Sequence, residues 1–260
     1  MNMLESVLVS AVLGLTALAT PASAQTNFVN MVDHIHLAAP DQAKGAEWYR
    51  AHFGAEPTPE GPDRMMLGTT RLIFQKTDEP KPSAESVLHL IGFSVADLDA
   101  TMKKLAADGV KVVMPAMTMQ GQKMAQVVDP WGMLIDVVQD SQKLGLHHVG
   151  LQSPNPTASL AWFADQFGGK VTKYNGQDGV NFGGVWLLAK KGQATPSAGH
   201  AFDHIGFRPI NVDNVVVAMK AKNIKVTTEP RDLVLPSGTS MRLAFIEGPD
   251  GVRIEIVQRR

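Results

Sequence analysis

The sequence predicts an α+β protein made of two tandem copies of one domain, with four βαβββ modules in all. Three observations predict it: an internal repeat, strand-like and helix-like segments in the same order within each copy, and a globular composition. The 260 residues suit one large domain or two ordinary ones. Hydrophobic residues make up 44% and charged residues 19%, which is typical of a chain that buries a core.

The repeat relates the two halves by a constant shift. With a shift of 114, His34 aligns with His148, and Gly92-Phe93 aligns with Gly206-Phe207. Beyond a five-residue insertion near 231–239, the shift becomes 119 and aligns Asp136 with Glu255. A repeat of this length indicates duplicated domains, which we place at 30–141 and 144–260.

Each copy has the same expected elements. Residues 32–38 alternate between apolar and polar as a strand does, and Asp41 is a suitable N-cap for a helix that ends at Gly54. The further elements of the first copy are expected as strands near 64–67, 71–75, 87–95 and 133–138 and a helix over 97–108.

The first 24 residues are predicted to be a secretory signal peptide. The apolar run Val7–Ala19 is too short to span a bilayer comfortably, and the small residues Ala22-Ser23-Ala24 form a cleavage site before Gln25. Glu5 is unusual there, so a frayed N-terminal helix is the alternative. We expect an exported protein, periplasmic or secreted, whose mature form has no membrane span.

Composition also limits the possible partners and ligands. The chain has no cysteine, so disulfides are excluded, and any metal must be bound by His, Asp or Glu. The formal net charge is −1 and no basic tract occurs, so a nucleic-acid partner is not expected.

Three polar residues stand at the centres of otherwise apolar strands in the second copy: His148, His204 and Glu255. A buried ionised glutamate needs a partner, and a divalent metal bound by two imidazoles and one carboxylate would supply it. The alternative is that these are ordinary core residues satisfied by hydrogen bonds.

The stretches His148-Val149-Gly150-Leu151, His204-Ile205-Gly206-Phe207 and 248–255 resemble signature strands of the vicinal oxygen chelate superfamily. This superfamily includes glyoxalase I, extradiol dioxygenases and fosfomycin resistance enzymes. The resemblance implies that the four modules pair to form two cup-shaped mixed sheets. It also implies that one cup surrounds one divalent metal, with His148, His204 and Glu255 as its ligands.

In the first copy, the counterpart of His204 is Leu90. The neighbouring His89 should face the opposite side of its strand by alternation, as should His147 beside His148. A bulge at His89 would reverse this. We therefore expect the first copy to be free of metal, which resembles the two-domain extradiol dioxygenases.

The resemblance implies an enzyme acting on a small molecule with two neighbouring oxygens, dioxygenase-like in layout. It implies Fe²⁺ first, with Mn²⁺, Zn²⁺ or Ni²⁺ open. Extradiol dioxygenases carry a tyrosine where Phe245 stands, and glyoxalase I has a second glutamate on a strand that here reads 185–188 without a carboxylate. A glyoxalase-like lyase or isomerase and a non-catalytic binding protein therefore remain alternatives.

Arg253 and Glu255 are the predicted catalytic residues. Arg253 should point into the cup, where its guanidinium suits a carboxylate or enolate oxygen of a possibly anionic substrate. Pairing with Glu255, or exposure to solvent, is the alternative for Arg253. The sequence leaves the substrate and the oligomeric state open.

Overall fold

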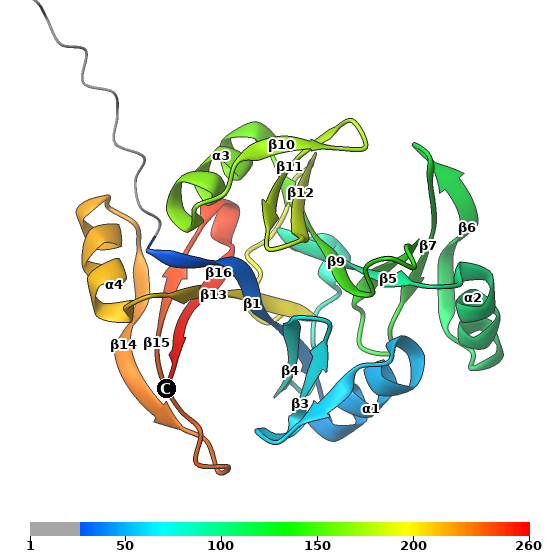
Figure 1. Cartoon of the computed structure of the whole chain (residues 1–260), viewed down its shortest axis with the longest axis horizontal. Coiled ribbons are helices and arrows are strands. Elements are labelled where there is room, and N and C mark those ends of the chain that lie inside the picture. Colours follow the sequence, from blue (N-terminus) through cyan, green and yellow to red (C-terminus); the bar gives the residue numbers. More distant parts are fainter. Residues whose placement is uncertain (1–26) are drawn as a thin grey trace, which may run out of the picture.

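The structure is a computed structural model that describes residues 27–260 (Figure 1). The predicted signal peptide, residues 1–24, lies outside the described residues. Within the described part of the chain, no helix is long and apolar enough to cross a bilayer.

The described chain contains four successive modules, each a strand, a helix and three further strands. Module 1 consists of β1 (Phe28–Ala39), α1 (Gln42–Phe53), β2 (Glu56–Thr58), β3 (Gly61–Leu67) and β4 (Thr70–Lys76). Module 2 consists of β5 (Leu88–Val95), α2 (Leu98–Ala107), β6 (Lys111–Met119), β7 (Gln122–Val128) and β8 (Leu134–Gln139). A short 3-10 helix, Ser83–Glu85, precedes module 2.

The second half repeats this order. Module 3 consists of β9 (Gly145–Ser153), α3 (Pro156–Phe167), β10 (Val171–Tyr174), β11 (Gln177–Phe182) and β12 (Val185–Lys191). Module 4 consists of β13 (Phe202–Pro209), α4 (Val212–Ala221), β14 (Val226–Val234), β15 (Ser240–Glu247) and β16 (Arg253–Arg259), with a 3-10 turn at Pro249–Gly251.

All four helices begin in the same way. Asp41, Asp97, Asn155 and Asn211 each accept a hydrogen bond from the backbone N–H three residues later, which satisfies a donor that the helix leaves free. The predicted stop of α1 is present as well, because Gly54 adopts the left-handed conformation with φ of 70°.

The four modules form two mixed sheets of eight strands, but each sheet combines modules from both halves of the chain. The first sheet joins modules 1 and 4 in the order β14-β15-β16-β13-β1-β4-β3-β2. The second sheet joins modules 2 and 3 in the order β10-β11-β12-β9-β5-β8-β7-β6. The α+β class and the two eight-stranded sheets are confirmed, whereas the expectation that one cup is built from one sequence repeat is wrong.

Antiparallel pairs at the sheet centres make these joints. β1 pairs with β13 in the first sheet, and β5 pairs with β9 in the second. Only a few residues separate β8 from β9, so the chain passes directly from module 2 into module 3. These two consecutive modules then lie side by side in one sheet.

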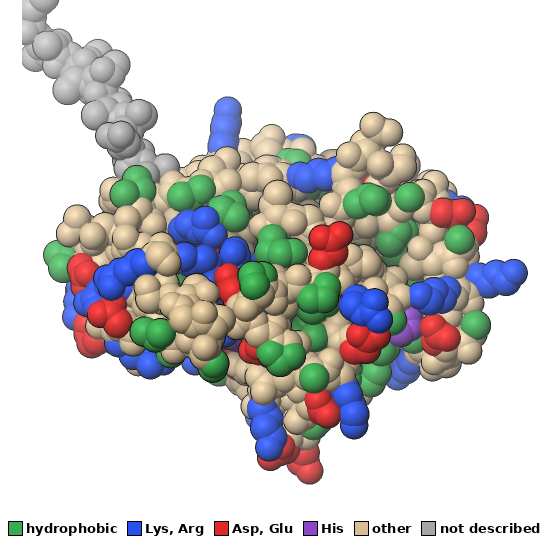
Figure 2. Space-filling view, turned by 60° about the horizontal axis from the view of Figure 1, so that its bottom comes forward, with side chains coloured by type: hydrophobic (Ala, Val, Ile, Leu, Met, Phe, Trp, Pro, Cys, Tyr) green, Lys and Arg blue, Asp and Glu red, His purple; other side chains and the backbone are tan. Residues whose placement is uncertain are grey.

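One hydrophobic core connects the two sheets. Phe167 of α3 stacks on Phe207 of β13 with ring centroids 4.0 Å apart, and Tyr49 of α1 contacts Phe93 of β5. A helix from one sheet's modules thus packs against a strand of the other, which holds the sheets together. On the outer face shown in Figure 2, acidic and basic side chains are interspersed.

Candidate metal centre

Two β-bulges position the polar side chains at the centre of the first sheet. Between β1 and β13 the register shifts around Asp33 and again around Asp203. A bulge lets two adjacent residues project toward the same side of a strand. The pairs Asp33-His34 and Asp203-His204 therefore act together, each as a histidine with its own carboxylate.

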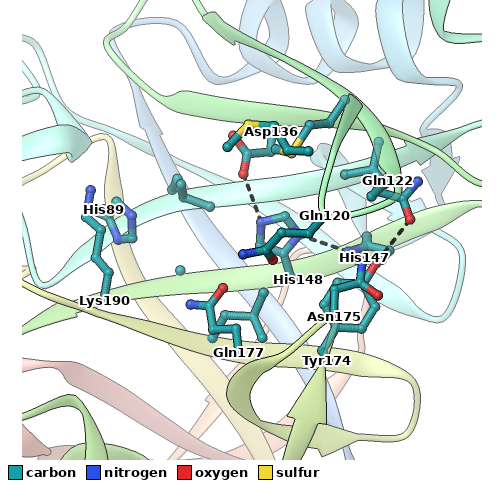
Figure 3. A pocket seen from close by; sticks show the side chains of 16 residues that line it. His89, Gln120, Gln122, Asp136, His147, His148, Tyr174, Asn175, Gln177 and Lys190 are labelled. Carbon is teal, nitrogen blue, oxygen red and sulfur yellow. Dashed lines mark hydrogen bonds and ion pairs between the residues drawn. The ribbon is translucent and has the colours of Figure 1, made fainter. Parts of the chain in front are cut away.

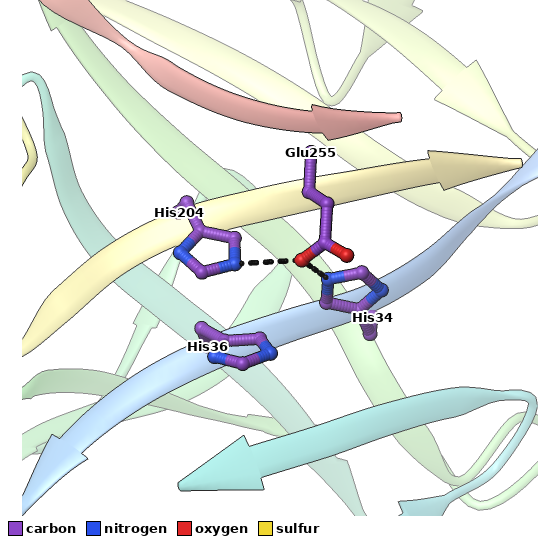
Figure 4. Close-up of side chains that lie close together, drawn as sticks. All are labelled: His34, His36, His204 and Glu255. Atoms are coloured by element: carbon purple, nitrogen blue, oxygen red, sulfur yellow. Dashed lines mark hydrogen bonds and ion pairs between the residues drawn. The ribbon is translucent and has the colours of Figure 1, made fainter. Parts of the chain in front are cut away.

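Four side chains meet at this place (Figure 4): His34 and His36 of β1, His204 of β13 and Glu255 of β16. One possible ligand atom from each lies within 4.8 Å of the others. The Glu255 Oε2 lies 3.1 Å from the Nε2 atoms of both His34 and His204. His34, His204 and Glu255 are at most 5% exposed.

His34 and His204 each have an aspartate carboxylate next to the ring nitrogen that points away from Glu255. The Nδ1 of His34 lies 2.9 Å from Asp33, and the Nδ1 of His204 lies 2.6 Å from Asp203. Carboxylates that accept the Nδ1–H of a metal-binding histidine fix its tautomer and aim its Nε2 at the metal. The burial and contacts of Asp33 and Asp203 match that role.

Arginines in turn hold these two carboxylates. Arg208 and Arg259 both bind Asp33, the latter at 2.9 Å, and Arg253 donates to Asp203 at 2.6 Å. Burial alone would raise the pKa of Asp203, but hydrogen bonding to His204 and the charges of His204 and Arg253 lower it to about 2. Asp203 therefore stays ionised and can accept the histidine proton.

Hydrogen-bond counting shows that this arrangement fits a cation. A neutral imidazole has only one N–H, and in His34 and His204 the Nδ1–H already faces an aspartate. Their Nε2 atoms then present lone pairs toward the Glu255 carboxylate, which also carries only lone pairs. Either both rings carry an extra proton or a metal ion lies between these atoms, and the three histidines and one glutamate suit a divalent metal.

The pKa directions agree with a site organised for positive charge. Burial alone would raise the pKa of Glu255, but the charges and hydrogen bonds of His34 and His204 hold it well below its usual range. Burial alone would lower the pKa of His34, yet Glu255 and Asp33 raise it. Glu255 is thus an anion in a buried place, where a cation is its natural partner.

His36 is the fourth member of the cluster and has no carboxylate behind it. Its ring stacks on that of His204 with centroids 4.0 Å apart, and its buried Nδ1 has no hydrogen-bond partner. Burial, and then the neighbouring His204 and His34, hold the pKa of His36 well below its usual value. The ring is therefore neutral and offers a nitrogen lone pair at the cluster.

A small apolar cluster lies beside the four candidate metal ligands. Val257 follows Glu255 by two residues on β16, and the paired residues Leu243 and Phe245 on β15 share that face. With Leu235, Met241 and the partly buried Leu233, they form a separate hydrophobic cluster. The surroundings of the four ligands are thus apolar on the β15 side.

The structure separates the three predicted ligands. His204 and Glu255 lie together, but His148 is on β9 in the second sheet, where its Nε2 lies 3.1 Å from Asp136. The predicted grouping of His148 with His204 and Glu255 is therefore wrong. The position expected for His148 is taken by His34, its counterpart in the repeat, because module 4 pairs with module 1.

Two predicted side-chain directions are also wrong. Bulges at His89 and His147 turn these residues toward the same side as Leu90 and His148, and all four line one pocket. Arg253 does not bind Glu255: it binds Asp203, and its guanidinium carbon lies 4.3 Å from the centroid of the Phe245 ring. A direct role of Arg253 on a substrate stays a prediction.

His34 and His36 are the site residues that the sequence reasoning did not choose. A signal for them exists, since the tripeptide Asp-His-Ile occurs at 33–35 and again at 203–205. The corresponding positions of modules 2 and 3 read His89-Leu90-Ile91 and His147-His148-Val149. The shared tripeptide would have grouped module 1 with module 4.

Comparison with known proteins agrees with this architecture. The model of the Glyoxalase/Bleomycin resistance protein/Dioxygenase superfamily matches residues 31–137 and again 145–256. No curated protein sequence matches the chain significantly.

Two solved structures have a similar fold. Glyoxalase I from Zea mays is similar with a TM-score of 0.66 and 16% identity, over 88% of this chain and 92% of that one. A putative dioxygenase from Bacillus subtilis is similar with a TM-score of 0.57 and 14% identity, over 88% of this chain and 85% of that one. The duplicated family match, with the four-module architecture, shows that the chain belongs to the Glyoxalase/Bleomycin resistance protein/Dioxygenase superfamily.

Proposed function

We propose that the chain is an exported, metal-dependent enzyme that acts on a small molecule with two neighbouring oxygens. The observation that supports this most is the convergence of His34, His36, His204 and Glu255 within 4.8 Å, in a chain of this superfamily. The carboxylates behind His34 and His204 form an arrangement that is typical of metal-binding histidines.

The bound metal would act as a Lewis acid that polarises the substrate oxygens. Fe²⁺ is the leading candidate, and a nitrogen- and oxygen-donor set also accepts Mn²⁺, Zn²⁺ or Ni²⁺. His34, His204 and Glu255 would hold it on one side. The apolar side chains of β15 would exclude water and contact the hydrocarbon part of the substrate.

His36 has two possible roles in the proposed enzyme. With its free lone pair it serves either as a fourth ligand or as the base that takes a proton from a substrate hydroxyl. Arg253 would contribute through Asp203 to the aim of His204, and its partly exposed guanidinium remains able to attract an anionic substrate.

A dioxygenase-like reaction is the leading proposal, and a glyoxalase-like lyase or isomerase is the second. The observation behind the second is His36, because a proton-transfer reaction needs a base but no oxygen. β4 of the first sheet, Thr70–Lys76, carries no carboxylate, so a glutamate ligand on this strand is not available to either reaction.

The experiment is reconstitution of the metal-free protein with Fe²⁺, Mn²⁺, Zn²⁺ or Ni²⁺, followed by assays on catechols with an oxygen electrode. Oxygen uptake that needs Fe²⁺ supports the dioxygenase. Turnover of dicarbonyl-type substrates with Ni²⁺ or Zn²⁺ and without oxygen uptake supports the lyase. Metal binding without turnover in any assay would leave a small-ligand binding protein and overturn the enzymatic proposal.

His36→Ala separates the two roles of His36 in the same assays. Loss of metal identifies a ligand, whereas retained metal with lost turnover identifies a base. Export is tested separately by N-terminal sequencing of the mature protein, which should begin at or near Gln25. Intact Met1 on the mature protein would contradict export.

A further inference from the structure

The second sheet holds a pocket at the place that corresponds to the metal cluster of the first. The pocket has a volume of about 290 Å³ and opens between β5, β8, β9 and the β10–β11 and β6–β7 turns. Figure 3 shows His148 and Asp136 in it, with Tyr174, Gln122 and Gln177 around them.

The polar pair within the pocket is already satisfied. The Asp136 carboxylate contacts the Nε2 of His148 at 3.1 Å and accepts from Gln126 at 2.8 Å. The positions of the other two ligands of the first sheet, His36 and His204, are taken here by Gly150 and Leu90. The pocket therefore offers space and apolar surface where the first sheet offers imidazoles.

His89 differs from the other polar residues of the pocket. The bulge on β5 turns it into the lining, its side chain is buried, and its Nδ1 has no hydrogen-bond partner. An unsatisfied buried polar nitrogen costs free energy, and a ligand atom that fills the vacancy recovers it. His89 thus marks a place where a hydrogen-bonding ligand atom is needed.

Lys190 lies beside this nitrogen. Figure 3 shows its side chain running alongside the His89 ring, and burial together with the charge of Lys190 lowers the pKa of His89 to about 3. Asp136 is the one acidic residue of the lining. It is paired with His148, so it does not neutralise the charge of Lys190. The one N–H of the neutral His89 ring faces the Gly150 carbonyl, so its Nδ1 offers a lone pair that can accept from a donor group of a ligand. The ammonium group of Lys190 beside it can recognise a carboxylate.

The other lining residues indicate the chemistry of the rest of the ligand, the part that bears the carboxylate. Leu90, Met124, Val138 and Leu188 line the pocket, together with amide side chains and Tyr174. This combination suits an apolar body rather than a sugar or a phosphate ester. The volume is at the lower end for ligand pockets, which suits a small ligand.

We propose that the second sheet is a metal-free binding site for a small monocarboxylate with an apolar body. The carboxylate contacts Lys190, and the hydrocarbon part packs against Leu90 and Leu188. The Nδ1 of His89 accepts from a hydroxyl or N–H of the ligand where one is present. The site is separate from the metal centre and does not depend on the proposed function of that centre.

The test measures binding of benzoate, phenylacetate and cyclohexanecarboxylate to the full chain after metal removal, by calorimetry and ligand-observed NMR. Metal removal excludes coordination of these anions at the first sheet. We expect at least one to bind saturably with a dissociation constant in the millimolar range or below. Its neutral amide should bind roughly tenfold more weakly, since it lacks the charge that Lys190 recognises.

Two lysines at equivalent places of the repeat give a matched control. Lys190→Gln should lower the affinity for the carboxylate ligand roughly tenfold. Lys76→Gln, at the counterpart in the first sheet, should leave that affinity unchanged. Both lysines are exposed, so neither change should affect folding. Absence of saturable binding for all three acids, equal binding of acid and amide, or equal effects of the two lysine changes would overturn the proposal.

Discussion

The two sheets share strand order, bulges and a central histidine–carboxylate pair, yet their centres have different chemistry. In the first sheet, His34 and Glu255 are joined by two more imidazoles, and the carboxylates of Asp33 and Asp203 stand behind two of the rings. In the second, the corresponding pair of His148 and Asp136 stands beside Leu90 and Gly150.

The difference teaches that the backbone alone does not make the metal centre. The bulges that aim Asp33 and Asp203 are also present at His147 and His89, so both sheets can present two adjacent side chains at the same places. Side-chain identity at four to six positions decides whether that backbone carries a candidate metal cluster or an open pocket.

The largest effect should come from removing the charge of the carboxylate ligand. Glu255→Gln keeps the shape but takes away the anion, so metal affinity should fall by more than about a hundredfold, beyond the range for residues behind a ligand. The stabilisation from the metal, about 2.7 kcal/mol at a hundredfold excess over Kd, should disappear from the melting curve. The matched change Asp136→Asn should leave metal affinity unchanged, and equal losses in both variants would contradict the comparison.

The next largest effect should come from the carboxylate behind His204. Asp203→Asn weakens the hold on the His204 Nδ1–H, so metal affinity measured by competition with a chelator should fall roughly 10–100-fold. Asp213→Asn, which removes an exposed carboxylate paired with Arg242, serves as the control. An unchanged affinity in Asp203→Asn would show that the aspartate only stabilises the fold.

The repeat and the capping residues were enough to predict the four modules, because both depend on local spacing. The pairing of modules 1 with 4 and 2 with 3 was not predictable in the same way. A repeat shows which segments are alike, but not which of them become neighbours in a sheet. The predicted site therefore contains His148 in place of His34, although its grouping of His204 with Glu255 is correct.

The bulges explain the other errors in the predicted site. Strict alternation turned His89 and His147 away from the interior, and one extra residue in each strand reversed their direction. His36 was overlooked because its counterpart is Gly150, so the repeat drew no attention to it. The residue motif Asp-His-Ile, at 33–35 and 203–205, was the available signal.

A smaller effect, an increase in metal content, should follow from adding one possible metal ligand to the second sheet. Leu90→His would add an imidazole to His148 and Asp136, so a second, weaker metal site should raise the metal content above one equivalent per chain. Adding His148→Ala to this variant should remove the gain. If Leu90→His alone leaves the metal content at that of the wild type, the backbone of the second sheet does not place this imidazole next to His148 and Asp136.

The smallest effect on metal binding should come from Arg253. Its side chain is 35% exposed and reaches the metal ligands only through Asp203. Arg253→Leu, which restores the residue type of its counterpart Leu134, should change metal affinity by no more than a few-fold. An anionic substrate or inhibitor should bind more weakly to this variant than to the wild type, and an unchanged affinity for that ligand would exclude Arg253 from substrate recognition.

The most direct test of the account compares the metal content of His34→Ala and His148→Ala. These histidines occupy the same position of the repeat, one in each sheet, so they differ in surroundings rather than in local sequence role. The account predicts that the wild type binds about one divalent metal, that His34→Ala loses it, and that His148→Ala retains it with a chelator-sensitive melting temperature. Loss of the metal in His148→Ala and its retention in His34→Ala would contradict the assignment of the metal centre to the first sheet.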